Sequence, residues 1–252
     1  MKLRAIISVL LISQVCNSCI QTLLLRKVGV MEKEVNIKEA TNDKKLVVFL
    51  PMHHIGRESF YADVSRRIDS LRKLHFQIYF EAVKPSAHLT LEQKDTLNLK
   101  MRKIIGIDFI SMRNNGGYID TLNGTVNGIK MKAVKKYGLV NQPKPHQLKI
   151  DTTKDKQADL YMLDLLNEYE RKFGKVVLDE CDYANKPGTK YHCKKLKRKN
   201  ATEVILAYRN MHIANEVIND TSKKIAIVYG GKHFKGIVKN LQLQDPSWRI
   251  IP

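Results

Sequence analysis

Two similar phrases, far apart in the chain, constrain the fold more than any other feature of this sequence. Residues 47–56 read VVFLPMHHIG and residues 226–237 read AIVYGGKHFKGI. Each has an apolar run typical of a buried strand, a turn containing Pro or Gly, and then a histidine, His54 or His233. Only a fold that brings two strand ends together can unite these histidines. Because ligands bind beyond the carboxyl ends of strands in open α/β sheets, the phrases predict a site at that edge.

Hydrophobic periodicity predicts that strands and helices alternate along the chain. Short apolar runs favour strands over 45–50, 76–80, 175–178, 224–229 and 248–251. Apolar residues three and four positions apart favour helices over 58–74, 91–105, 156–173, 202–218 and 234–241. Turn-forming residues mark 114–117 and 123–124, and two prolines favour a loop over 138–146.

This alternation predicts an α/β fold. The strand, helix and strand over 45–80 form a βαβ unit, which normally implies a parallel pair of strands. We expect a mostly parallel central sheet flanked by helices, in a single domain with a helical and loop-rich middle insertion. A chain of 252 residues that is 43% hydrophobic is long and apolar enough for one such core.

The N-terminus predicts export. Lys2 and Arg4 precede an apolar stretch over 5–15, which is typical of a signal peptide and too short for a membrane span. A serine directly before Cys19 resembles a bacterial lipoprotein cleavage site, with Cys19 as the lipidated residue; a simple signal peptide or an uncleaved anchor is the alternative. We therefore expect a protein anchored at the cell envelope, with a signal peptide over 1–18, a tether and lead-in over 19–43 that contains one edge element, and a folded domain over 44–252.

Export affects the interpretation of the remaining cysteines. After cleavage and lipidation the mature chain keeps two thiols, Cys181 and Cys193. An even pair in an oxidising compartment predicts a disulfide, and closing so short a loop contributes roughly 2–3 kcal/mol. A metal site formed by the two thiols and His192 is an alternative, although it lacks the C-x-x-C spacing.

The charge of the chain favours anionic partners. Lys and Arg number 44 against 25 Asp and Glu, which gives a net charge of +19 at pH 7. Acidic lipid headgroups or acidic envelope polymers are the expected partners of such a surface. The sequence contains neither a basic motif interleaved with aromatic residues nor zinc-finger spacing, so nucleic acid is not an expected partner.

The residues around the two histidines resemble a known family. They include a strand that ends near His54, a strand that ends in Glu81, the helical pair Arg209 and Asn210, and the sequence GGKH over 230–233. In this combination the chain resembles the TraB/Tiki superfamily, which includes GumN-like bacterial proteins and is related to erythromycin esterases and ChaN-like haem-binding proteins. The resemblance covers the two ends of the region 44–240 and leaves the middle, 90–190, unmatched.

One of the two family motifs is altered. The second Gly-x-x-His motif is intact as Gly230 and His233, whereas Pro51 stands where the glycine of the first motif would be, before His54. Proline lacks an amide donor and fixes φ, so a role for that glycine's amide is lost here. The resemblance implies an exported or membrane-associated, hydrolase-like fold. Some members are metal-dependent proteases, one branch opens macrolide esters and another binds haem.

The resemblance also implies residue roles. His54 and His233 become metal ligands or acid–base groups, Glu81 a carboxylate ligand or base, and Arg209 a cation that faces the site. Two neutral imidazoles and a carboxylate can hold a divalent ion such as Mn, Zn or Co, and the ion would lower the pKa of a bound water. Without a metal, Glu81 and one histidine can act as an acid–base pair around an attacking water.

Two further features suit a catalytic site. Arg209 can hold a substrate carboxylate or a developing oxyanion, or it can be a buried ion-pair partner for Glu81. The backbone amides of Gly230 and Gly231 can bind an anion. His53, next to His54, is expected to point to the opposite side of its turn.

These residues lead to one expectation and two alternatives. We expect a metal-dependent hydrolase of the peptidase or esterase type, with a site formed by His54, Glu81, Arg209 and His233. The first alternative is a non-catalytic envelope lipoprotein that binds haem or another small ligand in the same place. The second is a basic surface protein that only docks to acidic envelope polymers. Each histidine also has a plain structural interpretation as a residue at a strand end.

Overall fold

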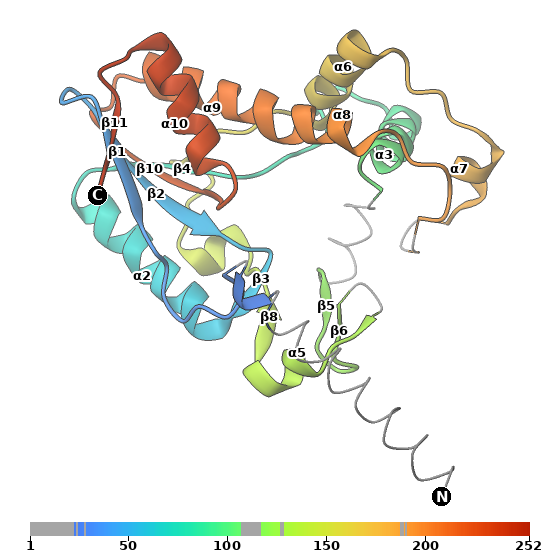
Figure 1. Cartoon of the computed structure of the whole chain (residues 1–252), viewed down its shortest axis with the longest axis horizontal. Helices are drawn as coiled ribbons and strands as arrows, with labels where there is room; N and C mark the ends of the chain where they lie inside the picture. The colour runs from blue at the N-terminus through green and yellow to red at the C-terminus, as the bar shows by residue number, and fades with distance from the viewer. Residues whose placement is uncertain are drawn as a thin grey trace, which may run out of the picture.

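A six-stranded sheet organises the part of the chain that the structure describes, with strand order β11-β1-β2-β10-β4-β9 (Figure 1). The computed structural model describes residues 23, 25–27, 29–106, 117–126, 129–186, 189 and 191–252. The neighbouring strands β2 (Leu46–Met52), β10 (Lys224–Gly230), β4 (Gln77–Phe80) and β9 (Lys156–Gln157) are parallel. The strands β1 (Lys38–Thr41) and β11 (Arg249–Ile251) extend the sheet in antiparallel fashion. The predicted single α/β domain with a mainly parallel sheet is confirmed.

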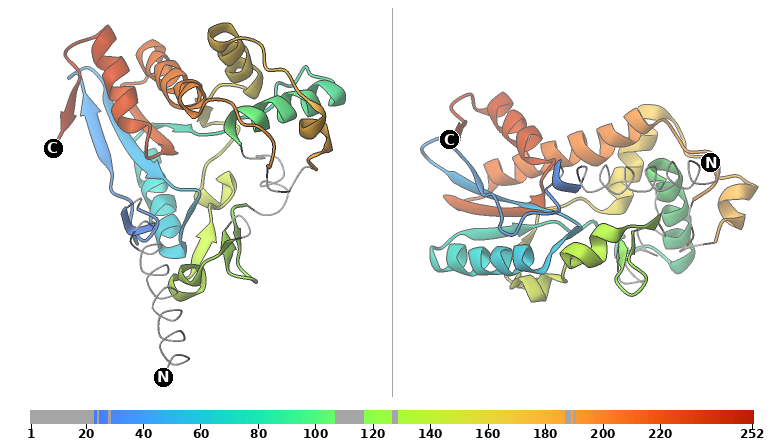
Figure 2. Two further views of the ribbon diagram at one scale, coloured as in Figure 1. Left: turned by 45° about the vertical axis from the view of Figure 1, so that its right-hand side comes forward. Right: turned by 60° about the horizontal axis from the view of Figure 1, so that its bottom comes forward.

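Side chains of the central strands alternate between two hydrophobic clusters. On β2, Val48 and Leu50 pack with the buried face of α2 (Glu58–Lys73), whereas Val47 and Phe49 pack with α9 (Arg209–Asn219) and α10 (Phe234–Gln244). Successive strand residues point to opposite faces, so a strand covered on both sides is apolar along its whole length. Figure 2 shows α2 on one side of the sheet and α9 and α10 on the other.

The insertion of β10 between β2 and β4 positions the site. The predicted βαβ unit is present, but its two strands are not neighbours, because both pair with β10. In this register Ile227 lies between Phe49 and Tyr79, and Gly230 lies beside Met52. The two strand ends that lead to the histidines are therefore adjacent.

The ends of α3 (Leu91–Ile105) show why the helix forms over the predicted residues. The Thr90 side chain accepts a hydrogen bond from the Gln93 amide, and the Gln93 side chain accepts one from the Thr90 amide. This capping box satisfies donors that the first helical turn leaves free. The helix ends at Gly106, whose φ of 75° is the left-handed conformation that glycine adopts without strain.

The middle of the chain forms two groups beside the sheet. Helices α3, α6 (Met162–Phe173) and α8 (Arg198–Thr202) share a third hydrophobic cluster, and α8 continues through a π-helical segment, Glu203–Tyr208, into α9. The second group comprises smaller elements. They are β3 (Ile55–Arg57) paired with β8 (Leu139–Asn141), the antiparallel strands β5 (Ile119–Asp120), β6 (Thr125–Val126) and β7 (Ile129–Lys130), α5 (Lys132–Tyr137) and the 3₁₀ turn Pro145–Leu148.

Three predictions about this region are wrong. Residues 175–178 form no strand, because they pair with no neighbour and Val177 is 74% exposed. The helix predicted over 156–173 begins only at Met162, since its first two residues pair with β4 as β9. The predicted loop over 138–146 contains β8 and the start of the 3₁₀ turn. The element expected within the lead-in is present as β1, which pairs with both β2 and β11.

The expected signal peptide over 1–18 and the lipidated Cys19 lie outside the described residues, as does most of the predicted turn over 114–117. Within the described ranges, no helix combines the length and the apolar character needed to cross a membrane.

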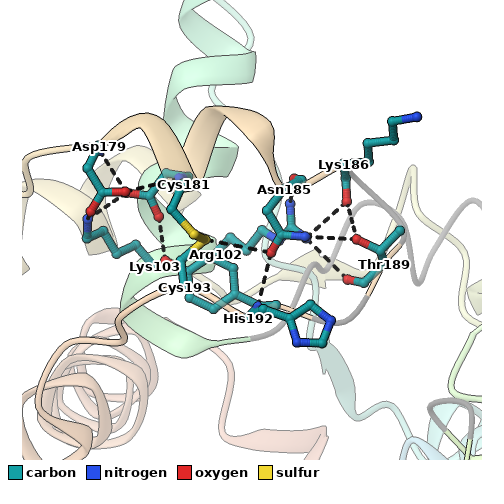
Figure 3. The surroundings of a disulfide bond; sticks show 11 residues. Arg102, Lys103, Asp179, Cys181, Asn185, Lys186, Thr189, His192 and Cys193 are labelled. Carbon is teal, nitrogen blue, oxygen red and sulfur yellow. Dashed lines mark hydrogen bonds and ion pairs between the residues drawn. A yellow bond between two sulfur atoms is a disulfide. The ribbon is translucent and has the colours of Figure 1, made fainter.

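The predicted disulfide is present between Cys181 of α7 (Glu180–Ala184) and Cys193, whose Cα atoms are 5.8 Å apart (Figure 3). Two neighbouring cationic side chains of α3 bind the segment between these cysteines. The Lys103 ammonium donates to the buried carboxylate of Asp182 at 2.5 Å, and the Arg102 guanidinium donates to three backbone carbonyls between the cysteines. Since both sulfur atoms are joined, the alternative metal site with His192 is not formed.

Candidate functional site

Polar side chains gather at the carboxyl ends of the four parallel strands. His54 follows β2, Glu81 directly follows β4, Asp159 follows β9 and His233 follows β10. Because these strands are parallel neighbours, their ends lie on the same edge of the sheet. Helix α9 places Arg209 at this edge, where its guanidinium donates hydrogen bonds to the carboxylates of Glu81 and Asp159. Glu81, Asp159 and Arg209 therefore meet at the carboxyl ends of these strands.

Glu81 is the centre of this arrangement. Its Oε1 accepts a hydrogen bond from Arg209 Nη2 at 2.7 Å, and its Oε2 accepts one from the Gly230 amide, also at 2.7 Å. The side chain is 20% exposed. Burial raises the pKa of the carboxyl, but the charge and hydrogen bond of Arg209 more than offset that effect, so the pKa lies below its ordinary value. Glu81 is therefore ionised at neutral pH.

Arg209 is buried between two carboxylates. Its Nε and Nη2 donate to the two oxygens of Asp159 at 3.0 and 2.7 Å, while Nη2 also donates to Glu81. Its guanidinium carbon lies 5.0 Å from the ring centre of Tyr229. The side chain is only 7% exposed. Of the two interpretations of Arg209 in the sequence, the ion-pair partner of Glu81 agrees with this geometry.

His233 is held as a neutral imidazole. It is 4% exposed, and its Nδ1 lies 2.7 Å from Oδ1 of Asn210. Because an amide oxygen only accepts hydrogen bonds, Nδ1 carries the proton and Nε2 keeps its lone pair. Burial, reinforced by the charge of Arg209, lowers the pKa of His233 to about 4. Nε2 forms no hydrogen bond to a residue in the described part of the chain.

A glycine allows Asn210 to reach His233. A Cβ atom at Gly236 would lie 2.0 Å from the Asn210 Nδ2, a distance that real atoms do not reach. Only glycine therefore fits at this position of α10 without moving Asn210. The amides of Gly230 and Gly231, predicted to bind an anion, are used within the protein. The first donates to Glu81, and the second donates to the Met52 carbonyl at 3.2 Å.

His54 is exposed and stacks on Tyr118, with ring centres 5.0 Å apart and ring planes inclined by 16°. In their protonated forms, His54 and His233 each lower the pKa of the Glu81 carboxyl. His53 instead packs on Phe60, with ring centres 5.4 Å apart. Glu81 and His233 both lie beside Gly230, where an added Cβ atom would be 3.3 Å from Glu81 Oε2 and 3.4 Å from His233 Cδ2, whereas His54 is linked to Glu81 only through its charge.

The expected metal ligands do not fit a bound ion in this arrangement. Among the residues described, no group of three or more His, Cys, Asp or Glu side chains is arranged to hold a metal. Both oxygens of Glu81 already accept hydrogen bonds, from Arg209 and from the Gly230 amide. The chemistry proposed below therefore uses no metal.

Sequence reasoning missed three residues of the site. Asp159 was assigned to a helix, although its place just after a short strand resembles that of Glu81. Tyr118 lies in a turn-rich segment that carries no motif. The role of Gly236 depends on its contact with Asn210, which no local pattern indicates.

The arrangement suits acid–base chemistry on water. It combines an ionised carboxylate, a neutral imidazole with an available lone pair and an exposed second imidazole. Comparisons with protein-family models, with curated proteins and with solved structures found no match to this chain. Its function is therefore argued from the site itself.

Proposed function

We propose that this protein is an exported lipoprotein, distantly related to the TraB/Tiki superfamily, that hydrolyses amide or ester bonds at the strand-end site. One observation carries the proposal. Ionised Glu81, held by Arg209 and the Gly230 amide, lies beside the neutral imidazole of His233 at adjacent strand ends. The net charge of +19 supports docking to acidic lipid or envelope polymers, where the peptide or ester substrate would be met.

Three side chains, those of His233, His54 and Glu81, act on the water and the substrate in the proposed reaction. Nε2 of His233 accepts a hydrogen bond from the attacking water and orients it. His54, the exposed imidazole, takes a proton from that water as its oxygen bonds to the carbonyl carbon, and Glu81 stabilises the resulting imidazolium. His54 then returns the proton to the leaving amine or alcohol as the scissile bond breaks. Arg209 contributes by keeping Glu81 ionised and in place.

The first test is hydrolysis by the purified, full-length protein. We expect turnover of p-nitrophenyl acetate or of a fluorogenic peptide, retained after dialysis against EDTA, and less than stoichiometric Mn, Zn or Co by elemental analysis. Absence of hydrolysis with both substrates would contradict the proposal. Loss of turnover in EDTA, with recovery on adding one of these ions, would instead restore the metal expected from the family resemblance.

The same preparation tests the alternative of a binding protein. A Soret band after haem is added, together with no hydrolysis, would favour a haem-binding lipoprotein.

A further inference from the structure

A tyrosine from the middle of the chain completes the site beside His54. Tyr118 directly precedes β5 and belongs to the region that the family resemblance leaves unmatched. Its ring lies face to face with the imidazole of His54, with centres 5.0 Å apart and planes inclined by 16°. An exposed histidine after a strand would otherwise sample several rotamers, and a stacked neighbour reduces that freedom.

Asn141 fixes the backbone of Ile119, the residue after Tyr118. Its Nδ2 donates to the Ile119 carbonyl and its Oδ1 accepts from the Ile119 amide, both at 2.8 Å. On the other side, a Cβ atom at Gly117 would lie 2.5 Å from Asn141 Cγ. Gly117 also has a φ of 111°, so glycine is required for conformation and for space. Asn141 thus clamps Ile119 through two hydrogen bonds and lies close against Gly117, so it contacts the residue on each side of Tyr118.

The same short strand also holds the backbone of His54. Asn141 in β8 pairs with Ile55 in β3, the residue after His54. The amide of Gln142 donates to the His54 carbonyl at 2.9 Å. One strand, β8, therefore sets the position of both stacked rings.

The Tyr118 phenol also responds to the charge of Glu81. Burial, helped by the negative charge of Glu81, raises the pKa of Tyr118 to about 12. The phenol is therefore neutral at physiological pH. Its hydroxyl forms no hydrogen bond to a residue that the structure describes, so the ring face is its defined contact with the site.

We propose that Tyr118 is a positioning residue, whose ring, clamped by Asn141, holds the His54 imidazole beside Glu81. The inference rests on the proposed hydrolysis and names a part of the middle region that the reaction requires. The ring is the active feature, so phenylalanine should replace tyrosine, whereas leucine should not. Small misplacements of a catalytic group reduce rates strongly, by about 10²-fold for roughly 1 Å.

Turnover of p-nitrophenyl acetate by the full-length protein tests whether Tyr118 positions His54. Tyr118→Phe should keep kcat within about twofold of the wild type, while Tyr118→Leu and Asn141→Ala should lower kcat by roughly 10- to 100-fold. Tyr183→Leu, at a 65% exposed tyrosine of α7, is the matched control and should behave as wild type. Thermal unfolding of each variant confirms that it is folded at the assay temperature.

A second readout does not depend on activity. The stacked ring should shift the His54 ring protons upfield in the NMR spectrum of the wild type and of Tyr118→Phe, and Tyr118→Leu should abolish that shift. An unchanged His54 spectrum in Tyr118→Leu would refute the stack. A lost shift with wild-type turnover would refute the positioning role, and slow turnover in Tyr118→Phe would assign the effect to the hydroxyl instead.

The two readouts also separate this inference from the proposed function. A wild-type protein that hydrolyses the ester while Tyr118→Leu is equally fast would overturn the inference and leave the function standing. A wild-type protein that hydrolyses neither test substrate would overturn both, whatever the His54 spectrum shows.

Discussion

Replacing Arg209 by methionine should lower the free energy of unfolding by about 3–5 kcal/mol, because two carboxylates then lose their shared cation. The Asp159 side chain is completely buried and that of Glu81 is 20% exposed. In the native protein each forms a hydrogen bond of 2.7 Å to Arg209 Nη2. Methionine fills a similar volume but leaves these charges uncompensated, which is why a large loss is expected. Urea unfolding at pH 7 measures it.

Two further variants show whether the cause is charge. Arg209→Met combined with Asp159→Asn should recover part of the stability, since one uncompensated charge is removed. Arg171→Met is the matched control, because Arg171 also pairs with a carboxylate, that of Glu168, but is 66% exposed. Its loss should stay below about 1 kcal/mol. Equal losses in Arg209→Met and Arg171→Met would contradict the ion-pair role.

Replacing His233 by glutamine should reduce ester or peptide hydrolysis by about 10²- to 10⁴-fold. Glutamine keeps a polar group near Asn210 but removes the lone pair of Nε2 that is proposed to orient the water. Gly236→Ala should act in the same direction, because its Cβ displaces the amide that orients His233. His146→Gln, at an exposed histidine, serves as the control. Full turnover in His233→Gln would refute the role of the imidazole.

The same residue predicts a pH dependence of stability. The pKa of His233 falls from its ordinary value of 6.5 to about 4 in the folded protein, so between these values the unfolded chain binds a proton that the folded chain does not. Its contribution is therefore complete above pH 6.5 and is lost as the pH falls to about 4, by about 3 kcal/mol. Urea unfolding from pH 7 to 4 should show this loss in the wild type and less of it in His233→Gln.

The parallel core was predictable because its signal is local. Strands covered on both faces are continuously apolar, and the runs that became β2 and β10 stand out in the sequence. The insertion of β10 between β2 and β4 was not predictable, since it depends on contacts between distant segments. Strand β9 was missed because it has only two residues, both polar, and the helical periodicity beyond it was extended over them.

The site residues show the same contrast between local signals, which the sequence reveals, and contacts between distant segments, which it does not. Glu81 and the two histidines could be predicted because each ends a recognisable strand. Asp159 was hidden by the error over β9. Tyr118 gave no signal at all, since its position depends on a side-chain clamp from Asn141 rather than on any motif.

Convergence of the two histidines on Glu81 is measured most directly by the pKa of the Glu81 carboxyl, followed by carbon-13 NMR. In the wild type this pKa should lie below its ordinary value, and His54→Gln and His233→Gln should each raise it, because each imidazole favours the ionised carboxylate. His75→Gln, at another exposed histidine, should leave it unchanged. A Glu81 pKa that does not respond to one of the two site variants would show that the histidines do not share this carboxylate.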